Sequence, residues 1–331
     1  NMAGFKIYHE ADADLNVLKG KKIAVLGFGS QGRAQSLCFH DSGLDVTIGA
    51  RKDGKSWKQA QEDGLKVAEF GDAVKDADVV MMLLPDEIQP DIYKQYVEPN
   101  LKKGAALEFA HGFAITYKLI VPPKDVDVIM MAPKSPGPAE RMQFLEGFGV
   151  PALICVHQDY SGKAKDIALC LAKGLGATRA GVFETVFDNE TKTDLFGEQA
   201  VLCGGLTALI KAGFQTLVDG GYPPIMAYFE VLHETKLIAD LIVKGGFMGM
   251  WDGVSNTAEY GGFSRRDRVI TPESYKGMKS ILEEVENGVF KDEWRAEWAN
   301  GLKNMKRMEK EESELLLEST GAEVRQLFQR K

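Results

Sequence analysis

The sequence predicts an α/β domain with a mostly parallel sheet, followed by an all-helical domain. Short apolar runs alternate with helical segments through the first half of the chain, and strand-like runs disappear after about residue 185. A glycine-rich GxGxxG stretch separates the first strand from the first helix. Strands that alternate with helices form βαβ units. We therefore expect residues 1–183 to form the first domain and residues 184–331 the second.

The elements follow from the spacing of apolar residues and from the glycines and prolines that end each run. In the first half we expect strands at residues 22–26, 45–49, 79–84, 105–109, 126–131 and 152–156, with helices at residues 30–40 and 163–175. In the second half, we expect helical segments at residues 194–218, 224–244, 274–287 and 291–330.

Composition excludes several classes of protein. The net charge of -8 argues against a nucleic-acid partner, and the four cysteines show no CxxC spacing, which argues against zinc and a disulfide framework. We find no uninterrupted apolar run of the roughly 20 residues that a membrane span needs. These features predict a cytoplasmic protein with reduced thiols, or one in an organelle stroma or matrix.

The GxGxxG predicts a Rossmann-type dinucleotide site. Its context decides this, because the motif alone is weak but here it follows a strand and opens a helix. Such glycines let backbone N–H groups approach a pyrophosphate at the helix N-terminus. The loop residues are Gly27, Phe28, Gly29, Ser30, Gln31 and Gly32.

The end of the second strand indicates which cofactor binds. An NAD site usually carries an acidic residue about 20 positions after the glycines. This chain has Arg51 and Lys52 there, then Lys55 and Ser56, which suit a 2′-phosphate. NADP(H) is therefore favoured, and NAD(H) stays open because Asp53 lies in the same loop.

Four carboxylates in the second half are spaced as two i, i+4 pairs, Asp194 with Glu198 and Glu230 with Glu234. On a helix each pair points from one face, and the flanking residues are apolar. Hard divalent cations, Mg²⁺ or Mn²⁺, would relieve the repulsion between them. Two alternatives are a solvated helix face and a di-iron site, for which only Glu230 and His233 have the spacing.

Ordered motifs across most of the chain resemble ketol-acid reductoisomerase, and those of the second half are the most specific. The similarity covers the GxGxxG, the loop ending at residues 55–57, and residues 83–87, 110–113, 132–137 and 149–154. It continues through residues 190–205, 230–234 and 255–261.

The resemblance implies a short-form enzyme with a single knotted helical domain, acting in valine and isoleucine biosynthesis. The enzyme would move an alkyl group in 2-acetolactate or 2-aceto-2-hydroxybutyrate and then reduce the product with NADPH. Its partners would be small 2-hydroxy-2-alkyl-3-keto acids and further copies of the chain, as a homodimer or larger.

The resemblance also implies roles for individual residues. Two Mg²⁺ would be held by Asp194, Glu198, Glu230 and Glu234, and the substrate carboxylate by Ser255. His111 and Lys134 would be catalytic. Besides the glycine loop, the cofactor would meet Arg51, Lys52, Ser56, Asp86, Glu87, Ile88, Gln89 and Gly137.

Departures from the family pattern occur at Phe28, Ala114, Ser135 and Pro138, and none removes a carboxylate. Two other functions remain open. A β-hydroxyacid-type dehydrogenase also joins a Rossmann domain to a helical one, but it needs no paired carboxylates. A non-enzymatic NADP-binding sensor would leave the carboxylates idle. Metal dependence separates the reductoisomerase from the dehydrogenase.

Overall fold

A computed structural model describes residues 5–328, and the chain divides into two compact units, Asn1–Thr191 and Lys192–Lys331. The division falls inside helix α9 (Phe187–Gly197). The boundary expected near residue 183 lies slightly earlier, in the last strand of the first unit.

The first unit is built on one sheet of nine strands in its described part, in the order β1-β9-β8-β7-β6-β5-β2-β3-β4. Most neighbours are parallel, and β8 is antiparallel to β7, as β1 is to β9. The predicted strands are present, while β1, β4 and β9 were not predicted. The bounds are β1 Ile7–Tyr8, β2 Lys22–Leu26, β3 Asp45–Gly49, β4 Lys66–Ala68, β5 Val79–Met82, β6 Ala106–Phe109, β7 Asp127–Pro133, β8 Ala152–Gln158 and β9 Val182–Thr185.

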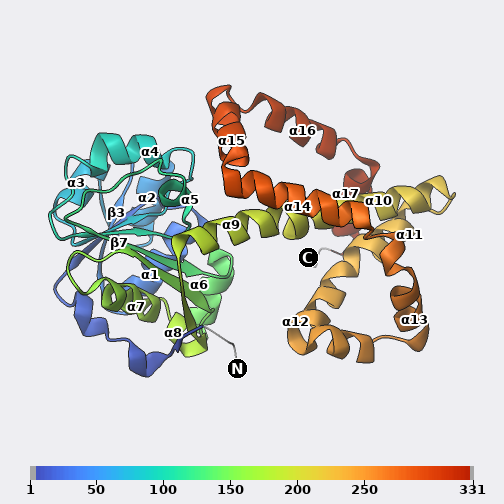
Figure 1. Ribbon diagram of the computed structural model, residues 1–331, viewed down its shortest axis with the longest axis horizontal. Coiled ribbons are helices and arrows are strands. Elements are labelled where there is room, and N and C mark those ends of the chain that lie inside the picture. Colours follow the sequence, from blue (N-terminus) through green and yellow to red (C-terminus); the bar gives the residue numbers. More distant parts are fainter. Residues whose placement is uncertain (1–4, 329–331) are drawn as a thin grey trace. The chain divides into compact units, whose positions relative to one another are not determined.

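Helices cover both faces of this sheet, as Figure 1 shows. Apolar side chains of α1 and α7 pack on one face of the sheet. Those of α3, α4 and α5 pack on the other face. Successive side chains of a strand point to opposite faces, so both faces are apolar. The helices are α1 Ser30–Asp41, α2 Lys55–Glu62, α3 Phe70–Lys75, α4 Gln89–Ile92, α5 Phe113–Thr116, α6 Gly137–Leu145, α7 Ala164–Gly174 and α8 Ala177–Ala180. Short turns are η1 Glu10–Asp12, η2 Leu15–Leu18 and the π turn η3 Tyr93–Val97.

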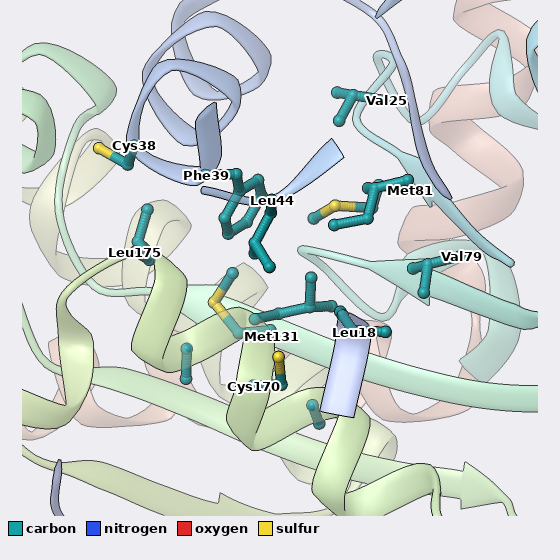
Figure 2. Close-up of a cluster of buried hydrophobic side chains, with 14 of the residues drawn as sticks. Leu18, Val25, Cys38, Phe39, Leu44, Val79, Met81, Met131, Cys170 and Leu175 are labelled. Atoms are coloured by element: carbon teal, nitrogen blue, oxygen red, sulfur yellow. The ribbon is translucent and has the colours of Figure 1, made fainter. Parts of the chain in front are cut away.

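The core under α1 and α7 fixes the position of the glycine loop. Figure 2 shows Phe39 of α1 beside Leu44, with Met81 and Met131 from the sheet close by. Phe39 and both methionines are fully buried. Since α1 begins directly after the loop, packing along its length holds the helix N-terminus against the sheet.

The second unit is helical throughout its described residues. The expected segment at residues 291–330 is three helices. Gly301 and Leu302, both with positive φ, make the first break, and extended backbone at Leu315 makes the second; residues 329 and 330 lie outside the described range. A helix at Asn256–Arg265 was not predicted. The elements are the π turn η4 Glu198–Leu202, α10 Gly204–Asp219, α11 Pro224–Tyr228, the π turn η5 Phe229–His233, α12 Thr235–Asp252, α13 Asn256–Arg265, η6 Arg266–Arg268, α14 Pro272–Asn287, α15 Val289–Ala299, α16 Lys303–Ser313 and α17 Leu316–Leu327.

This unit buries few of its apolar side chains. Its core cluster has five buried members: Phe214, Ala227, Tyr228, Leu317 and Val324. Most of the exposed large apolar side chains of the described residues belong to this unit, including Val243 at 88% and Phe247 at 71% exposed. Large exposed apolar surfaces mark protein–protein or membrane interaction sites, or ligand-binding grooves.

One helical run among the described residues, Phe187–Asp219, is long and apolar enough to cross a membrane by length and composition alone. It has 33 residues, and its most apolar 18-residue window has a mean hydropathy of 1.5. The run is interrupted by charged residues such as Asp194, Glu198 and Lys211, so the expectation of no uninterrupted apolar run of roughly 20 residues is not contradicted. The core helices of soluble proteins pass the same test of length and composition.

Candidate active site

Four loops of the first unit meet at one edge of the sheet. β2, β5, β6 and β7 are parallel neighbours, so their carboxyl ends lie side by side. The glycine loop follows β2, and residues 83–89 follow β5. His111 comes after β6 and Lys134 after β7. The carboxyl edge of an open α/β sheet is where ligands bind.

The three glycines of the loop are needed for different reasons. Gly27 has a φ of +100°, and a Cβ there would lie 2.5 Å from the Leu83 carbonyl oxygen. A Cβ on Gly32 would lie 2.3 Å from the Gly27 carbonyl oxygen, whereas one on Gly29 would meet nothing within 4 Å. The first and third glycines allow the tight turn, and the second faces open space that fits a pyrophosphate.

Two cavities lie along this edge. One of about 580 Å³ is lined by the glycine loop, the loop after β5 and His111; the other, of about 370 Å³, lies at the end of β3. Ser56 lines both. The predicted cofactor residues that line the larger cavity are Gly27, Phe28, Gly29, Ser30, Gln31, Ser56, Asp86 and Gln89. Those that line the smaller are Gly27, Arg51, Ser56 and Ile88.

Four predicted cofactor residues line neither cavity: Gly32, Lys52, Glu87 and Gly137. Two of them support the loop instead. Gly32 packs on Gly27, as described above. A Cβ on Gly137 would lie 2.2 Å from the Ser30 carbonyl oxygen, so the start of α6 packs against the start of α1. The side-chain amide of Gln31 donates to the Ser135 carbonyl at 2.8 Å, which ties the same two segments together.

Glu190, on α9, joins the two predicted catalytic residues. Its carboxylate lies 3.1 Å from Nδ1 of His111 and 3.4 Å from Nζ of Lys134, and it accepts from the Gly112 N–H at 2.9 Å. The Glu190 side chain is 1% exposed. Burial by itself raises the pKa of this carboxyl, but the hydrogen bond from His111 and the charges of His111 and Lys134 outweigh it and hold the pKa below its ordinary value.

Sequence reasoning did not assign Glu190 a role. It lies inside a matching motif, but it belongs to neither i, i+4 pair that drew attention to the metal carboxylates. Its spacing offered one signal: Glu190 and Asp194 are themselves i, i+4 on α9, so they share one side of that helix. The sequence contains three carboxylates in succession at this spacing, at residues 190, 194 and 198.

The four predicted metal carboxylates are exposed on this chain: Asp194, Glu198, Glu230 and Glu234. Their apolar neighbours do not bury them within the single chain, because the helical unit leaves much of its own apolar surface uncovered. Each pair lies at a π turn rather than on a plain α-helix. Ser255 caps α13, its Oγ accepting from the Ala258 N–H at 3.2 Å.

Comparisons with known proteins decide among the functions left open. Residues 17–181 match the family model described as acetohydroxy acid isomeroreductase, NADPH-binding domain. Residues 187–330 match the model described as ketol-acid reductoisomerase, C-terminal domain. This chain belongs to the ketol-acid reductoisomerase family. The dehydrogenase and sensor alternatives are set aside.

Individual members of the family agree along the whole chain. Ketol-acid reductoisomerase (NADP(+)) from Pyrobaculum calidifontis is 55% identical over 98% of both chains. The enzyme of the same name from Methanococcus maripaludis is 52% identical over 97% of this chain and 98% of its own. The structure of an NADH-preferring ketol-acid reductoisomerase from an uncultured archean superposes with a TM-score of 0.95 at 49% identity, covering 98% of this chain and all of its own. The expected order, an α/β dinucleotide-binding domain followed by a helical one, is confirmed.

Proposed function

We propose that this chain converts 2-acetolactate and 2-aceto-2-hydroxybutyrate to 2,3-dihydroxy acids, by alkyl migration followed by reduction, in valine and isoleucine biosynthesis. One observation carries the proposal. His111 lines the cavity of the glycine loop and contacts Glu190, which shares one side of α9 with Asp194. Within the first unit, one histidine thereby joins the cavity of the glycine loop to Glu190, the first carboxylate of the row on α9.

The carboxylates fit Mg²⁺ by their donor chemistry, because all four offer hard oxygen ligands. Asp194, Glu198, Glu230 and Glu234 would together hold two such ions. Bound Mg²⁺ acidifies a hydroxyl and polarises a neighbouring ketone, which is the activation that an alkyl shift requires. Ser255, at the start of α13, would hydrogen-bond the substrate carboxylate in addition to capping the helix.

Glu190 would orient the catalytic pair. An ionised carboxylate only accepts hydrogen bonds, so Nδ1 of His111 carries the proton in this contact. The imidazole ring is thus oriented at the end of β6, with its Nδ1–H directed at Glu190. Lys134 keeps its cation beside the same carboxylate, where it is placed to stabilise negative charge on substrate oxygens.

For the cofactor we favour NADP(H). Arg51 and Ser56 line the cavity at the end of β3, where the second ribose of a dinucleotide bound to the glycine loop would lie. A guanidinium and a hydroxyl suit a 2′-phosphate. The alternative, NAD(H), is supported by Asp53 in the same loop and by the NADH preference of the structural neighbour.

We further propose a homodimer, or an assembly of dimers, whose active sites are completed across subunits. The exposed carboxylates and the exposed apolar side chains of the second unit support this, because a second copy would cover both. All four cysteines are free thiols, which supports the proposed cytoplasmic location; fractionation of the source cells would check it.

Acetolactate-dependent oxidation of NADPH tests the proposed function. EDTA should abolish it, and Asp194→Asn should do the same while leaving NADPH affinity within twofold. Glu190→Gln should lower kcat by roughly 100-fold, in the range expected when one positioned catalytic group is lost. Asp240→Asn, which alters another exposed carboxylate in the same unit, is the matched control and should be active. Full activity of the wild type without metal would sink the proposal.

A further inference from the structure

The helix that bears the first carboxylate pair widens into a π turn at the second member of that pair. α9 ends at Gly197, and the π turn η4 begins at Glu198. The Cys203 N–H closes the turn by donating to the Glu198 carbonyl, five residues earlier, at 3.0 Å. Such turns contain one residue more than an α-helical turn and are frequent at functional sites.

The second carboxylate pair has the same feature. Glu230 lies inside the π turn η5, and Glu234 follows it directly. The Glu234 N–H donates to the Phe229 carbonyl, again five residues earlier, at 3.2 Å. The third π turn of the described residues, η3, is in the first unit; Glu98 follows it directly, but η3 carries no i, i+4 pair of carboxylates. Within the helical unit, therefore, each described π turn coincides with one pair.

Two glycines make η4 sterically possible. A Cβ on Gly204 would lie 2.2 Å from the Gln199 carbonyl oxygen, and one on Gly205 would lie 2.0 Å from the Ala200 carbonyl oxygen. In each case the oxygen belongs to the residue five positions earlier, the spacing of the hydrogen bond that closes the turn. An added methyl group would push directly on the backbone carbonyls of the π turn.

The extra residue of η4 sets the rotation of one helix relative to the other. Each α-helical residue turns the chain by about 100°. Before the turn, α9 carries Asp194. After it, α10 carries Phe214, which is 2% exposed in the core of the second unit. If η4 became α-helical, α10 would rotate by about 100° relative to α9, so Asp194 and Phe214 could not both keep their directions.

We infer that Gly204 and Gly205 are positioning residues for divalent-metal binding: they permit the π turn that aims Glu198, together with Asp194, while α10 stays packed in the core. This inference rests on the proposed function. It adds to that function a pair of residues that touch no substrate, cofactor or metal and act only through the shape of the helix.

The test substitutes each glycine in the full-length protein and measures Mg²⁺ binding by titration calorimetry. Gly204→Ala and Gly205→Ala should each raise the Kd for Mg²⁺ at least tenfold and leave the Kd for NADPH within twofold. At saturating Mg²⁺, kcat should recover in part. The matched control is Gly277→Ala in α14, an exposed helical glycine whose added Cβ would meet nothing within 4 Å. It should bind Mg²⁺ like the wild type.

The outcomes separate the two proposals. A wild type that binds no Mg²⁺ would contradict the proposed function. A wild type that binds Mg²⁺, with folded Gly204→Ala and Gly205→Ala proteins that bind it equally well, would overturn only the role of the glycines. If neither variant folds, hydrogen exchange of the wild type decides. Mg²⁺ should slow exchange at the amides of Cys203, Gly204 and Gly205 but not at Gly277, and unchanged exchange there would overturn the inference.

Discussion

Arg51 and Ser56 line the cavity at the end of β3, whereas the neighbouring Lys52 does not. We therefore expect Arg51→Ala combined with Ser56→Asp to raise the KM for NADPH far more than that for NADH. Each lost charge-assisted hydrogen bond should cost about 1.5–3 kcal/mol. Steady-state kinetics with both cofactors measure this, and Lys52→Ala is the control, which should change the ratio little. A wild type that already prefers NADH would show that Asp53, rather than Arg51, meets the ribose.

The same residues show what a sequence reveals about a site. The glycine loop could be predicted because its neighbours form a strand and a helix, and His111 and Lys134 because their motifs match a family. That Arg51 lines the cavity and Lys52 does not could not be predicted, because the direction of each side chain depends on how the loop folds. Glu190 was missed for a related reason: its burial depends on contacts with Gly112 and His111, far away in the sequence.

At the scale of single elements, strand β6 carries a buried carboxyl group. Glu108 is fully buried, and one of its oxygens accepts from the Met131 N–H at 3.0 Å. Burial raises the pKa of Glu108 from 4.5 to about 8, although this hydrogen bond opposes the shift. Between these pKa values the unfolded chain releases the proton and the folded chain keeps it. The free energy of unfolding therefore falls as pH rises through this window.

Glu108→Gln should remove that dependence. Urea unfolding at several pH values between about 5 and 8 should show the wild type losing up to about 1.4 kcal/mol per pH unit more than the variant. Glu140, whose pKa burial also raises to about 8, is present in both proteins, so the difference isolates Glu108. Parallel slopes for the two proteins would show that Glu108 is ionised in the folded state at neutral pH.

Elements were predictable where one local signal was strong. The central strands are continuous apolar runs, and the structure has all of them. β4 (Lys66–Ala68) is an edge strand, and β9 (Val182–Thr185) is next to the edge strand β1. Both are short and mix apolar with polar residues, so only their pairing with neighbouring strands identifies them. The π turns η4 and η5 were not predicted, because helical periodicity tolerates one additional residue without a visible break in the apolar pattern.

At the scale of the whole molecule, the shared active site is the strongest consequence of the proposed dimer. Two inactive variants, Asp194→Ala and Glu230→Ala, should restore activity when they are unfolded and refolded together. If the two pairs meet across subunits, one site of each mixed dimer collects both substitutions and the other collects neither. Random pairing makes about half the dimers mixed, so roughly a quarter of wild-type activity should return. Confirmed mixed dimers without any activity would place all four ligands on one chain.

The central claim is that alkyl migration precedes reduction, and proton NMR of the product tests it most directly. The purified chain is given 2-acetolactate, NADPH and Mg²⁺, and the methyl signals of the dihydroxy acid are recorded. Migration puts both methyl groups on a carbon that bears no hydrogen, so we predict two methyl singlets. Reduction without migration would leave one methyl group beside the newly formed CH–OH, and a methyl doublet in its place would contradict the account.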